Sequence, residues 1–302
     1  MKDCLGEIIK NIKNLKIQGA HHIAEASLKF LQSYADSNKL LNSRKFVYKL
    51  DRAIAELIKV RPTEPLAHNL LTEVKSLINK SSALPTKQIN KLIDQKISLL
   101  IDQLATSEKN IQKFSSKLIK NGQNIFTHCH SSEVESILVA AENSGKRFKV
   151  FNTETRPLLQ GRITAKNLIK HNIPVTMVAD SAAGFLISEG SGKKVMMDIA
   201  FLGADAILPD GSVINKIGSY GIALSCFYTK VPIYIVSTLL KYDPKGLIKI
   251  EIRPEEEIWP DKPKGLKIIN FAFDKIPVKF ITGIICEFGI IKPNQIKKYV
   301  SR

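Results

Sequence analysis

The spacing of apolar residues divides the chain into two parts. Up to residue 120, apolar side chains recur three and four positions apart, which is the spacing of one face of an α-helix. Residues 47–58 form one such face, and this helix is expected to end before Arg61-Pro62-Thr63 because a proline disfavours helical geometry in the preceding residue. Further helices are predicted over 66–78 and 86–119, so residues 1–120 are expected to form a helical N-terminal domain.

The period changes after the turn signal Asn121-Gly122-Gln123-Asn124. Beyond it, short apolar segments alternate with helical ones. The predicted strands cover 125–128, 148–151, 174–178, 196–202 and 233–237, and the predicted helices cover 133–144, 163–171, 182–188 and 218–228. Alternation at this spacing is typical of βαβ units and predicts a parallel sheet with helices on both faces. Residues 121–302 are therefore expected to form an α/β domain.

The composition is that of an ordinary globular protein. Hydrophobic residues make up 44% and charged residues 24% of the 302, which excludes collagen-like, disulfide-scaffold and disordered classes. Four cysteines without a CxxC pair indicate a reducing compartment and argue against a zinc ribbon. Apolar runs such as residues 231–236 are far shorter than the roughly 20 residues of a membrane span. The charged N-terminus is unlike a signal peptide, so we expect a soluble, cytoplasmic protein without a membrane partner.

The net charge of +17 is the unusual feature of the composition. The excess of Lys and Arg is spread along the chain, without a run of five or more. Such a diffuse charge suits RNA, a polyphosphorylated small molecule or simple solubility, of which solubility is the plainest, and a nucleic-acid partner is not expected. Neither GxGxxG nor GxxxxGK[ST] occurs, which argues against a nicotinamide dehydrogenase and a P-loop enzyme.

Cys129 is the first candidate for chemistry. It lies in Thr127-His128-Cys129-His130-Ser131-Ser132, after the first predicted strand and before its helix. A thiol at a helix N-terminus often has a lowered pKa and acts as a nucleophile or base. The alternative is an inert buried cysteine in a strand-end turn. The two flanking histidines point to different faces, so no metal site is expected there.

Asp205 follows the predicted strand that ends at residue 202. A carboxyl there acts as a general acid when its surroundings raise its pKa, and the alternative is a capping or turn aspartate. Asn215 and Lys216 are expected in a loop shared with Asp210, where Lys216 suits a phosphate. Further polar groups follow other predicted strands, namely Glu154-Thr155-Arg156-Pro157, Asp180-Ser181 and Lys241. Because the carboxyl ends of parallel strands share one crevice, the sequence predicts a polar, partly cationic crevice with a thiol and a carboxylate.

Taken together, these segments resemble one family, which holds the archaeal ribose-1,5-bisphosphate isomerases, the methylthioribose-1-phosphate isomerases and the regulatory subunits of eukaryotic translation initiation factor 2B. The matching segments are Gly19-Ala20, Arg61-Pro62-Thr63, Thr127-His128-Cys129-His130-Ser131, Glu154-Thr155-Arg156-Pro157, Gln160-Gly161, Asp180-Ser181-Ala182, Gly203-Ala204-Asp205, Asp210–Gly218, Lys241–Pro244 and Asn270–Asp274. The resemblance implies a helical N-terminal domain followed by a Rossmann-like parallel-sheet domain. It also implies a homo-oligomer, a dimer or a hexamer, that associates through the C-terminal domain.

The resemblance to the isomerases assigns catalysis to Cys129 and Asp205. It implies conversion of α-ribose 1,5-bisphosphate to ribulose 1,5-bisphosphate, a step in archaeal AMP breakdown, by Cys/Asp acid–base chemistry without a metal or cofactor. The residues that it assigns to the phosphorylated sugar are Gln18, Gly19, Ala20, His21, Arg61, Ser131, Ser132, Glu133, Asn215, Lys216 and Lys241.

Three departures from the isomerase pattern keep other functions open. Gln18 stands where the isomerases have Arg, Ser132-Glu133 stands where they have Lys-Ala, and Glu64-Pro65 replaces the usual Ala-Val. The serine pair is closer to the translation-factor branch. The alternative is therefore a non-catalytic relative that binds a phosphorylated metabolite or a protein partner. A methylthioribose-1-phosphate isomerase would need an apolar pocket for the thioether, which no segment of the sequence demands.

Overall fold

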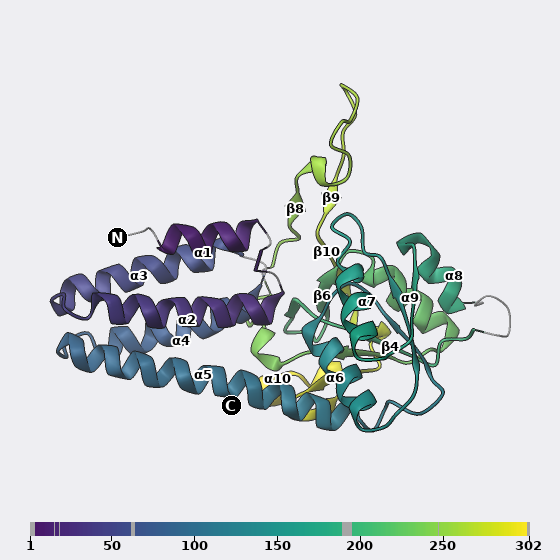
Figure 1. Ribbon diagram of the computed structural model, residues 1–302, viewed down its shortest axis with the longest axis horizontal. Helices are drawn as coiled ribbons and strands as arrows, with labels where there is room; N and C mark the ends of the chain where they lie inside the picture. The colour runs from purple at the N-terminus through teal and green to yellow at the C-terminus, as the bar shows by residue number, and fades with distance from the viewer. Residues whose placement is uncertain are drawn as a thin grey trace. The chain divides into compact units, whose positions relative to one another are not determined.

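The computed structural model describes residues 4–14, 16–17, 19–61, 64–188, 195–246 and 248–300 (Figure 1). The chain divides into two compact units, Met1–Thr106 and Ser107–Arg302. The boundary between them falls inside a long helix, α5 (Thr86–Ser115).

The first unit is helical, as the apolar spacing predicts. Its helices are α1 (Cys4–Lys13), α2 (Ala20–Asn38), α3 (Ser43–Val60), α4 (Pro65–Lys80) and the greater part of α5. In the apolar face predicted over residues 47–58 of α3, Leu50, Ile54 and Leu57 are buried, and Val47 and Ile58 are half-buried. The helix starts where the Asn42 side chain accepts a hydrogen bond of 2.9 Å from the Lys45 N–H, which satisfies one of the unpaired donors of the first turn.

The second unit is built on a seven-stranded sheet of order β12-β11-β7-β4-β1-β2-β3. The strands are β1 (Asn124–Thr127), β2 (Lys149–Thr153), β3 (Val175–Val178), β4 (Ile199–Leu202), β7 (Ile233–Val236), β11 (Gly283–Cys286) and β12 (Gly289–Ile291). Neighbouring strands are parallel, except that β12 pairs antiparallel with β11. The predicted α/β class with a mostly parallel sheet is confirmed.

Helices cover both faces of this sheet. The principal ones are α6 (Ser132–Asn143), α7 (Gly161–Lys170), α8 (Ala183–Ser188) and α9 (Ser219–Thr229), with α10 (Lys297–Val300) near the C-terminus (Figure 1). Side chains of β4 alternate between two cores. Ile199 and Phe201 pack with α6, α7 and the end of α5, whereas Ala200 and Leu202 pack with α8 and α9. Burial on both faces explains why the strands are short continuous apolar runs rather than alternating ones.

A three-stranded antiparallel sheet, which the sequence did not predict, lies in the same unit. It has the order β10-β6-β5, from β5 (Ala206–Ile207), β6 (Val213–Lys216) and β10 (Phe273–Ile276). The expectation that residues 210–216 form one loop is therefore wrong. Only a turn at Asp210 and Gly211 precedes β6. Strand β6 depends on pairing with residues of β10 some sixty positions away, such as Asn215 with Asp274. The local spacing of apolar residues does not reveal a partner so far along the chain.

The remaining strands form a small ladder that projects from the second unit, β8 (Ile252–Arg253) with β9 (Asn270–Phe271) (Figure 1). Short 3₁₀ helices complete the chain: η1 (Asp180–Ala182), η2 (Leu239–Lys241), η3 (Glu255–Glu257), η4 (Val278–Phe280) and η5 (Pro293–Gln295). Across the part of the chain that the structure describes, we find no helix with the length and apolar character needed to cross a membrane.

Candidate functional site

The candidate residues of the second unit follow the carboxyl ends of five neighbouring parallel strands. Because the strand order is β7-β4-β1-β2-β3, the loops after these strands are adjacent in the same order. The polar residues that these loops carry are Lys241 after β7, Asp205 after β4, Cys129 after β1, Thr155 after β2 and Asp180 after β3. This is the edge at which open α/β sheets bind their ligands.

Cys129 is held in a left-handed backbone conformation, with φ of 65°. Its N–H donates to the hydroxyl of Thr155 at 3.0 Å, and its carbonyl accepts from the hydroxyl of Thr164 at 2.9 Å. The thiol lies 3.7 Å from Oε1 of Gln160 and is 8% exposed. Thr155 lies in the loop after β2 and Thr164 lies in the first turns of α7. The stretch of chain from the end of β2 into α7 therefore fixes the backbone that carries the thiol.

The electrostatic surroundings of the thiol reverse the expectation of a lowered pKa. Burial raises the pKa of Cys129 to about 11, which outweighs the lowering by the Lys216 ammonium and the His130 N–H. The negative charges of Asp205 and Asp180 raise this pKa further. The thiol is therefore neutral at pH 7 in the unliganded protein. Lys216, Asp205 and Asp180 are thus the charged side chains whose electrostatic effect reaches the sulfur.

The loop that carries Asp205 packs on the N-terminus of α6. The side chain of Ser131 caps that helix by accepting from the Val134 N–H at 3.3 Å. Gly203 lies directly on Ser131 and is buried. Two residues later, the Asp205 N–H donates to the Ile214 carbonyl at 2.9 Å, and the residue is half-buried. The structure thus brings the predicted thiol and carboxylate to adjacent loops.

Asn215 and Lys216 end strand β6 rather than lying in a loop. Asn215 is buried, and its amide donates to the Ser219 hydroxyl at 2.8 Å. The Lys216 ammonium is 5.1 Å from the centroid of the Phe273 ring, and the residue is half-buried. An ammonium over an aromatic face is attracted by the ring quadrupole. The charge of Lys216 also acts on Cys129, whose pKa it lowers.

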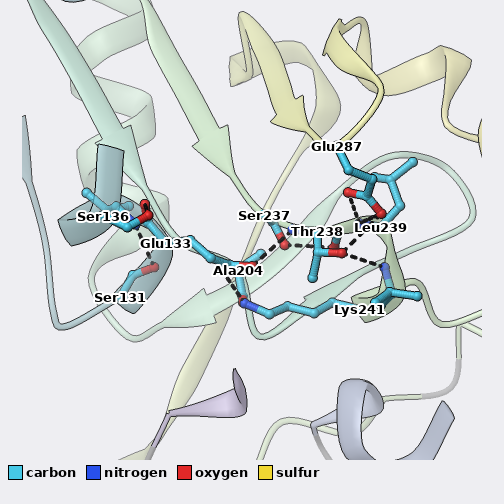
Figure 2. A network of polar contacts seen from close by, with 11 residues as sticks. Ser131, Glu133, Ser136, Ala204, Ser237, Thr238, Leu239, Lys241 and Glu287 are labelled. Carbon is cyan, nitrogen blue, oxygen red and sulfur yellow. Dashed lines mark hydrogen bonds and ion pairs between the residues drawn. The ribbon is translucent and has the colours of Figure 1, made fainter. Parts of the chain in front are cut away.

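Lys241 and Glu133, both expected to contact substrate, are buried and paired with each other (Figure 2). The Lys241 ammonium also donates to the carbonyl of Ala204 at 2.9 Å. Its charge is therefore already compensated within the protein. Direct contact of either side chain with a phosphate remains a prediction. Ser132, the first residue of α6, is half-buried.

The other predicted substrate residues belong to the first compact unit. Residues 19–21 form the start of α2, where Gly19 has φ of 85°, and Gln18 lies outside the described residues. Nε of Arg61 lies 3.6 Å from the Glu64 carboxylate. Glu64 and Glu133 are two of the departures from the isomerase pattern, and each pairs with a cation that the resemblance assigns to phosphate.

Two groups of the site were not predicted from the sequence. His128 is fully buried: its Nε2 donates to the Ile217 carbonyl at 2.8 Å and its Nδ1 faces the Thr153 hydroxyl. Burial lowers the pKa of His128 to about 4, so the ring is neutral. The contact between Gln160 and the thiol was missed as well, although Gln160-Gly161 is part of the family pattern. Only the fold shows that this segment returns to the end of β1.

Asp180 orders the loop beside the thiol. Its carboxylate accepts from the N–H groups of Thr155 at 2.8 Å and Arg156 at 2.6 Å. The described residues contain no group of three or more His, Cys, Asp and Glu side chains placed to hold a metal ion.

A pocket of about 260 Å³ opens beside this loop. It is lined mostly by apolar side chains, and its walls are Arg156, Pro157, Ile217, Ile258, Ile269, Asn270 and Phe271. Arg156 follows the residue that binds the Cys129 N–H, and the Ile217 carbonyl binds His128. The pocket therefore borders the candidate site. The sequence did not demand such an apolar pocket, because its lining comes from segments up to about a hundred residues apart.

The comparisons with known proteins agree on one family. A sequence model described as the Initiation factor 2 subunit family matches residues 16–293. The chain is 38% identical over 298 residues to ribose 1,5-bisphosphate isomerase of Methanocaldococcus jannaschii, an alignment that covers 97% of this chain and 92% of that protein. It is 34% identical over 321 residues to methylthioribose-1-phosphate isomerase of Acetivibrio thermocellus, covering 97% of this chain and 90% of that protein.

A solved structure supports the same assignment. The structure titled translation initiation factor eIF-2B from Pyrococcus horikoshii OT3 superposes with a TM-score of 0.82 at 26% identity, covering 98% of this chain and 99% of that one. The family match spans most of the chain, and the relatives exceed 30% identity over nearly its whole length. The chain therefore belongs to the Initiation factor 2 subunit family.

Proposed function

We propose that this protein is an aldose–ketose isomerase that converts α-ribose 1,5-bisphosphate to ribulose 1,5-bisphosphate. The substrate class is supported by the nearly full-length similarity to proteins named ribose 1,5-bisphosphate isomerase. The chemistry is supported by one observation above others: a buried thiol, Cys129, lies within the electrostatic influence of Asp205 and Lys216. A thiol, a carboxylate and a cation on adjacent strand-end loops are the groups that this isomerisation needs.

The reaction moves two protons. Opening the sugar ring requires a proton on the ring oxygen, and forming the ketose moves the hydrogen of C2 to C1 and releases the proton of the C2 hydroxyl. In the proposal, Cys129 as thiolate takes the C2 proton and returns it to C1. Asp205 as carboxylic acid protonates the ring oxygen and then takes the proton of the C2 hydroxyl. Both residues end in the form in which they began, and no step needs a metal or organic cofactor.

The protonation of Cys129 and Asp205 before substrate binds determines how the proposed proton transfers start. Since the pKa of Cys129 is raised to about 11, partly by the negative charge of Asp205, the resting pair is a thiol and a carboxylate. The cycle needs transfer of one proton from Cys129 to Asp205, which produces the base and the acid together and which the raised pKa of the thiol disfavours in the unliganded protein. Lys216 lowers the pKa of the thiol and so favours this transfer.

Phosphate binding is assigned to groups at the mouth of the same crevice. Helix α6 begins at Ser132, three residues after the thiol, and its first N–H groups are suited to an anion. Lys216 adds a positive charge beside the sulfur. Together they direct one phosphate of the substrate towards the pair of Cys129 and Asp205.

A second candidate reaction is isomerisation of methylthioribose 1-phosphate, favoured by the apolar pocket of about 260 Å³ beside the site. Ile258, Ile269 and Phe271 offer a surface for a thioether. A second phosphate would gain little from these three side chains, and its partner in the lining would be Arg156. The two substrates share the sugar rearrangement and differ in the group at C5. Which of the two substrates the protein binds therefore depends on the side chains that line the pocket.

Phosphorus NMR of the purified protein with each sugar phosphate tests these proposals. Appearance of ribulose 1,5-bisphosphate, absent with Cys129→Ser, supports the main proposal. Turnover of methylthioribose 1-phosphate alone would replace it with the second candidate. Turnover of neither sugar, with an unchanged thermal unfolding curve, would favour a non-catalytic protein that binds a phosphorylated metabolite or a protein partner.

The protein is further proposed to act as a cytoplasmic homo-oligomer. Exposed aromatic residues gather on α8 and α9, namely Phe185, Tyr220, Phe227 and Tyr228, and exposed patches of this kind commonly mark interfaces. Within residues 270–273, Phe271 is exposed, while Asn270, Ala272 and Phe273 are buried. Sedimentation at micromolar concentration tests the proposal, and a monomer there would contradict it.

A further inference from the structure

Glu133 lies at the centre of a buried polar network at the base of the candidate site (Figure 2). One carboxylate oxygen accepts from the Thr238 N–H at 3.0 Å, and the other pairs with the Lys241 ammonium. Both charged side chains are about 5% exposed. Such a pair costs desolvation energy, so it calls for a role beyond simple stability.

The network holds the lysine in one position. Lys241 lies in η2, and the start of that short helix is fixed by Glu287, whose carboxylate accepts from the Leu239 N–H at 3.0 Å and the Thr238 hydroxyl at 3.1 Å. Figure 2 shows the extended Lys241 side chain reaching back from η2 to Ala204 and Glu133. Its backbone and its ammonium are therefore both anchored.

The ammonium connects this network to the proposed acid. It donates to the carbonyl of Ala204 at 2.9 Å, and the next residue in the chain is Asp205. On the other side of the loop, the Asp205 N–H is bound to the Ile214 carbonyl. Both contacts are made by the single peptide group that joins Ala204 to Asp205. Its carbonyl and its N–H thus both have fixed partners, and the partner of the carbonyl, Lys241, is paired with Glu133.

We infer that Glu133 is a positioning residue which, through Lys241 and the Ala204 carbonyl, holds Asp205 beside Cys129. The inference rests on the proposed isomerase function and deepens it. Glu133 contacts no reacting atom in this assignment. It holds the lysine in place as its ion-pair partner, and the lysine keeps the loop in the geometry that the proton transfers need.

The competing explanation is that Glu133 only compensates the charge of Lys241. Removing one partner of a buried pair leaves an uncompensated charge, so a single variant tests stability rather than position. Replacing both partners by uncharged groups of similar size is often tolerated by the fold. The double variant Glu133→Gln/Lys241→Met therefore separates the two explanations.

The experiment compares kcat, KM and thermal unfolding of the wild type, the double variant and Glu142→Gln. Glu142 is the matched control, because it lies in the same helix and pairs with Arg147 at the surface. We expect the double variant to keep the unfolding temperature of the wild type while kcat falls by about 10- to 100-fold, since small misplacements of a catalytic group have effects of that size. KM separates positioning, which leaves it unchanged, from the predicted contact of Glu133 or Lys241 with a phosphate. Loss of such a contact would raise KM without a comparable fall in kcat, and that result would overturn the inference. Glu142→Gln should match the wild type. A double variant with wild-type kcat would overturn the inference.

A second measurement applies if the wild type isomerises neither sugar, in which case the proposed function fails by itself. The pH dependence of Cys129 alkylation by iodoacetamide then reports the position of Asp205, because the charge of Asp205 raises the pKa of this thiol. The double variant removes one negative and one positive charge that are paired with each other, so the net charge of the pair is zero before and after the change. The alkylation midpoint of the double variant should move to lower pH as Asp205 moves away. A midpoint equal to that of the wild type would overturn the inference.

Discussion

Gly203 and Ser131 are in direct contact: a β-carbon added at Gly203 would lie 2.7 Å from both Cβ and Oγ of Ser131. Ser131 caps the helix that follows Cys129, and Gly203 begins the loop that carries Asp205. The two halves of the proposed acid–base pair are therefore joined by a contact that only glycine allows.

Gly203→Ala should push these two loops apart. Since both atoms near the added methyl group belong to a capping side chain with little room to move, we expect a lower unfolding temperature and a fall in kcat of about tenfold or more. Gly221→Ala is the matched control, because Gly221 is an exposed residue of α9 with no atom within 4 Å of an added β-carbon. That change should leave kcat unaltered and stabilise the helix slightly. Equal activities of the two variants would contradict the contact.

Cys129→Ser should abolish isomerisation, with a loss of about 10³-fold or more in kcat, because a hydroxyl is far less acidic than a thiol and cannot serve as the base. Initial rates and circular dichroism of the variant provide the measurement. Cys226→Ala serves for comparison, since Cys226 lies in the core between α9 and its neighbours. It should lose stability but retain turnover. Full activity in Cys129→Ser would exclude Cys129 from catalysis.

The alkylation of Cys129 should rise steeply with pH. Because the pKa of this thiol is about 11, the reactive thiolate fraction grows about tenfold for each pH unit from pH 7 to pH 10. Mass spectrometry of the peptide that contains Cys129, after timed exposure to iodoacetamide, measures the rate at each pH. A rate that levels off below pH 9 would show that burial does not raise the pKa of this thiol.

His128 should make stability fall in mild acid. Its pKa is lowered from 6.5 to about 4, so the unfolded chain binds a proton more readily than the folded protein. The stabilisation by the neutral ring is complete above pH 6.5 and is lost as the pH falls towards 4, by up to about 3 kcal/mol.

Urea unfolding between pH 7 and pH 4.5 measures this dependence, with His128→Gln beside the wild type. The variant should show a flatter curve. Burial raises the pKa of Asp274 to about 6, which acts in the opposite direction but equally in both proteins. His171→Gln, at an exposed position of the chain, should follow the wild type. Parallel curves for His128→Gln and the wild type would contradict the assignment.

The fold class could be predicted from the sequence because its signals are local. Helix α3 and strands β1, β2 and β4 follow from apolar spacing, since each buries a regular set of side chains. Strand β6 escaped prediction because its hydrogen bonds depend on β10, far along the chain. Helix α5 ends at Ser115 rather than at residue 119, as helix ends depend on local caps that periodicity does not reveal.

By itself, the sequence determined the α/β architecture, the candidate pair Cys129 and Asp205, and the cationic character near them, because these follow from local patterns and residue types. Only the tertiary structure decided their electrostatic state. The thiol pKa is raised rather than lowered because burial outweighs the lowering by Lys216 and the His130 N–H. The charge of Lys241 is compensated because the fold brings Glu133 to it from 108 positions away. Burial and long-range pairing depend on which side chains the fold packs around a residue, so they cannot be predicted from the residue's neighbours in the sequence.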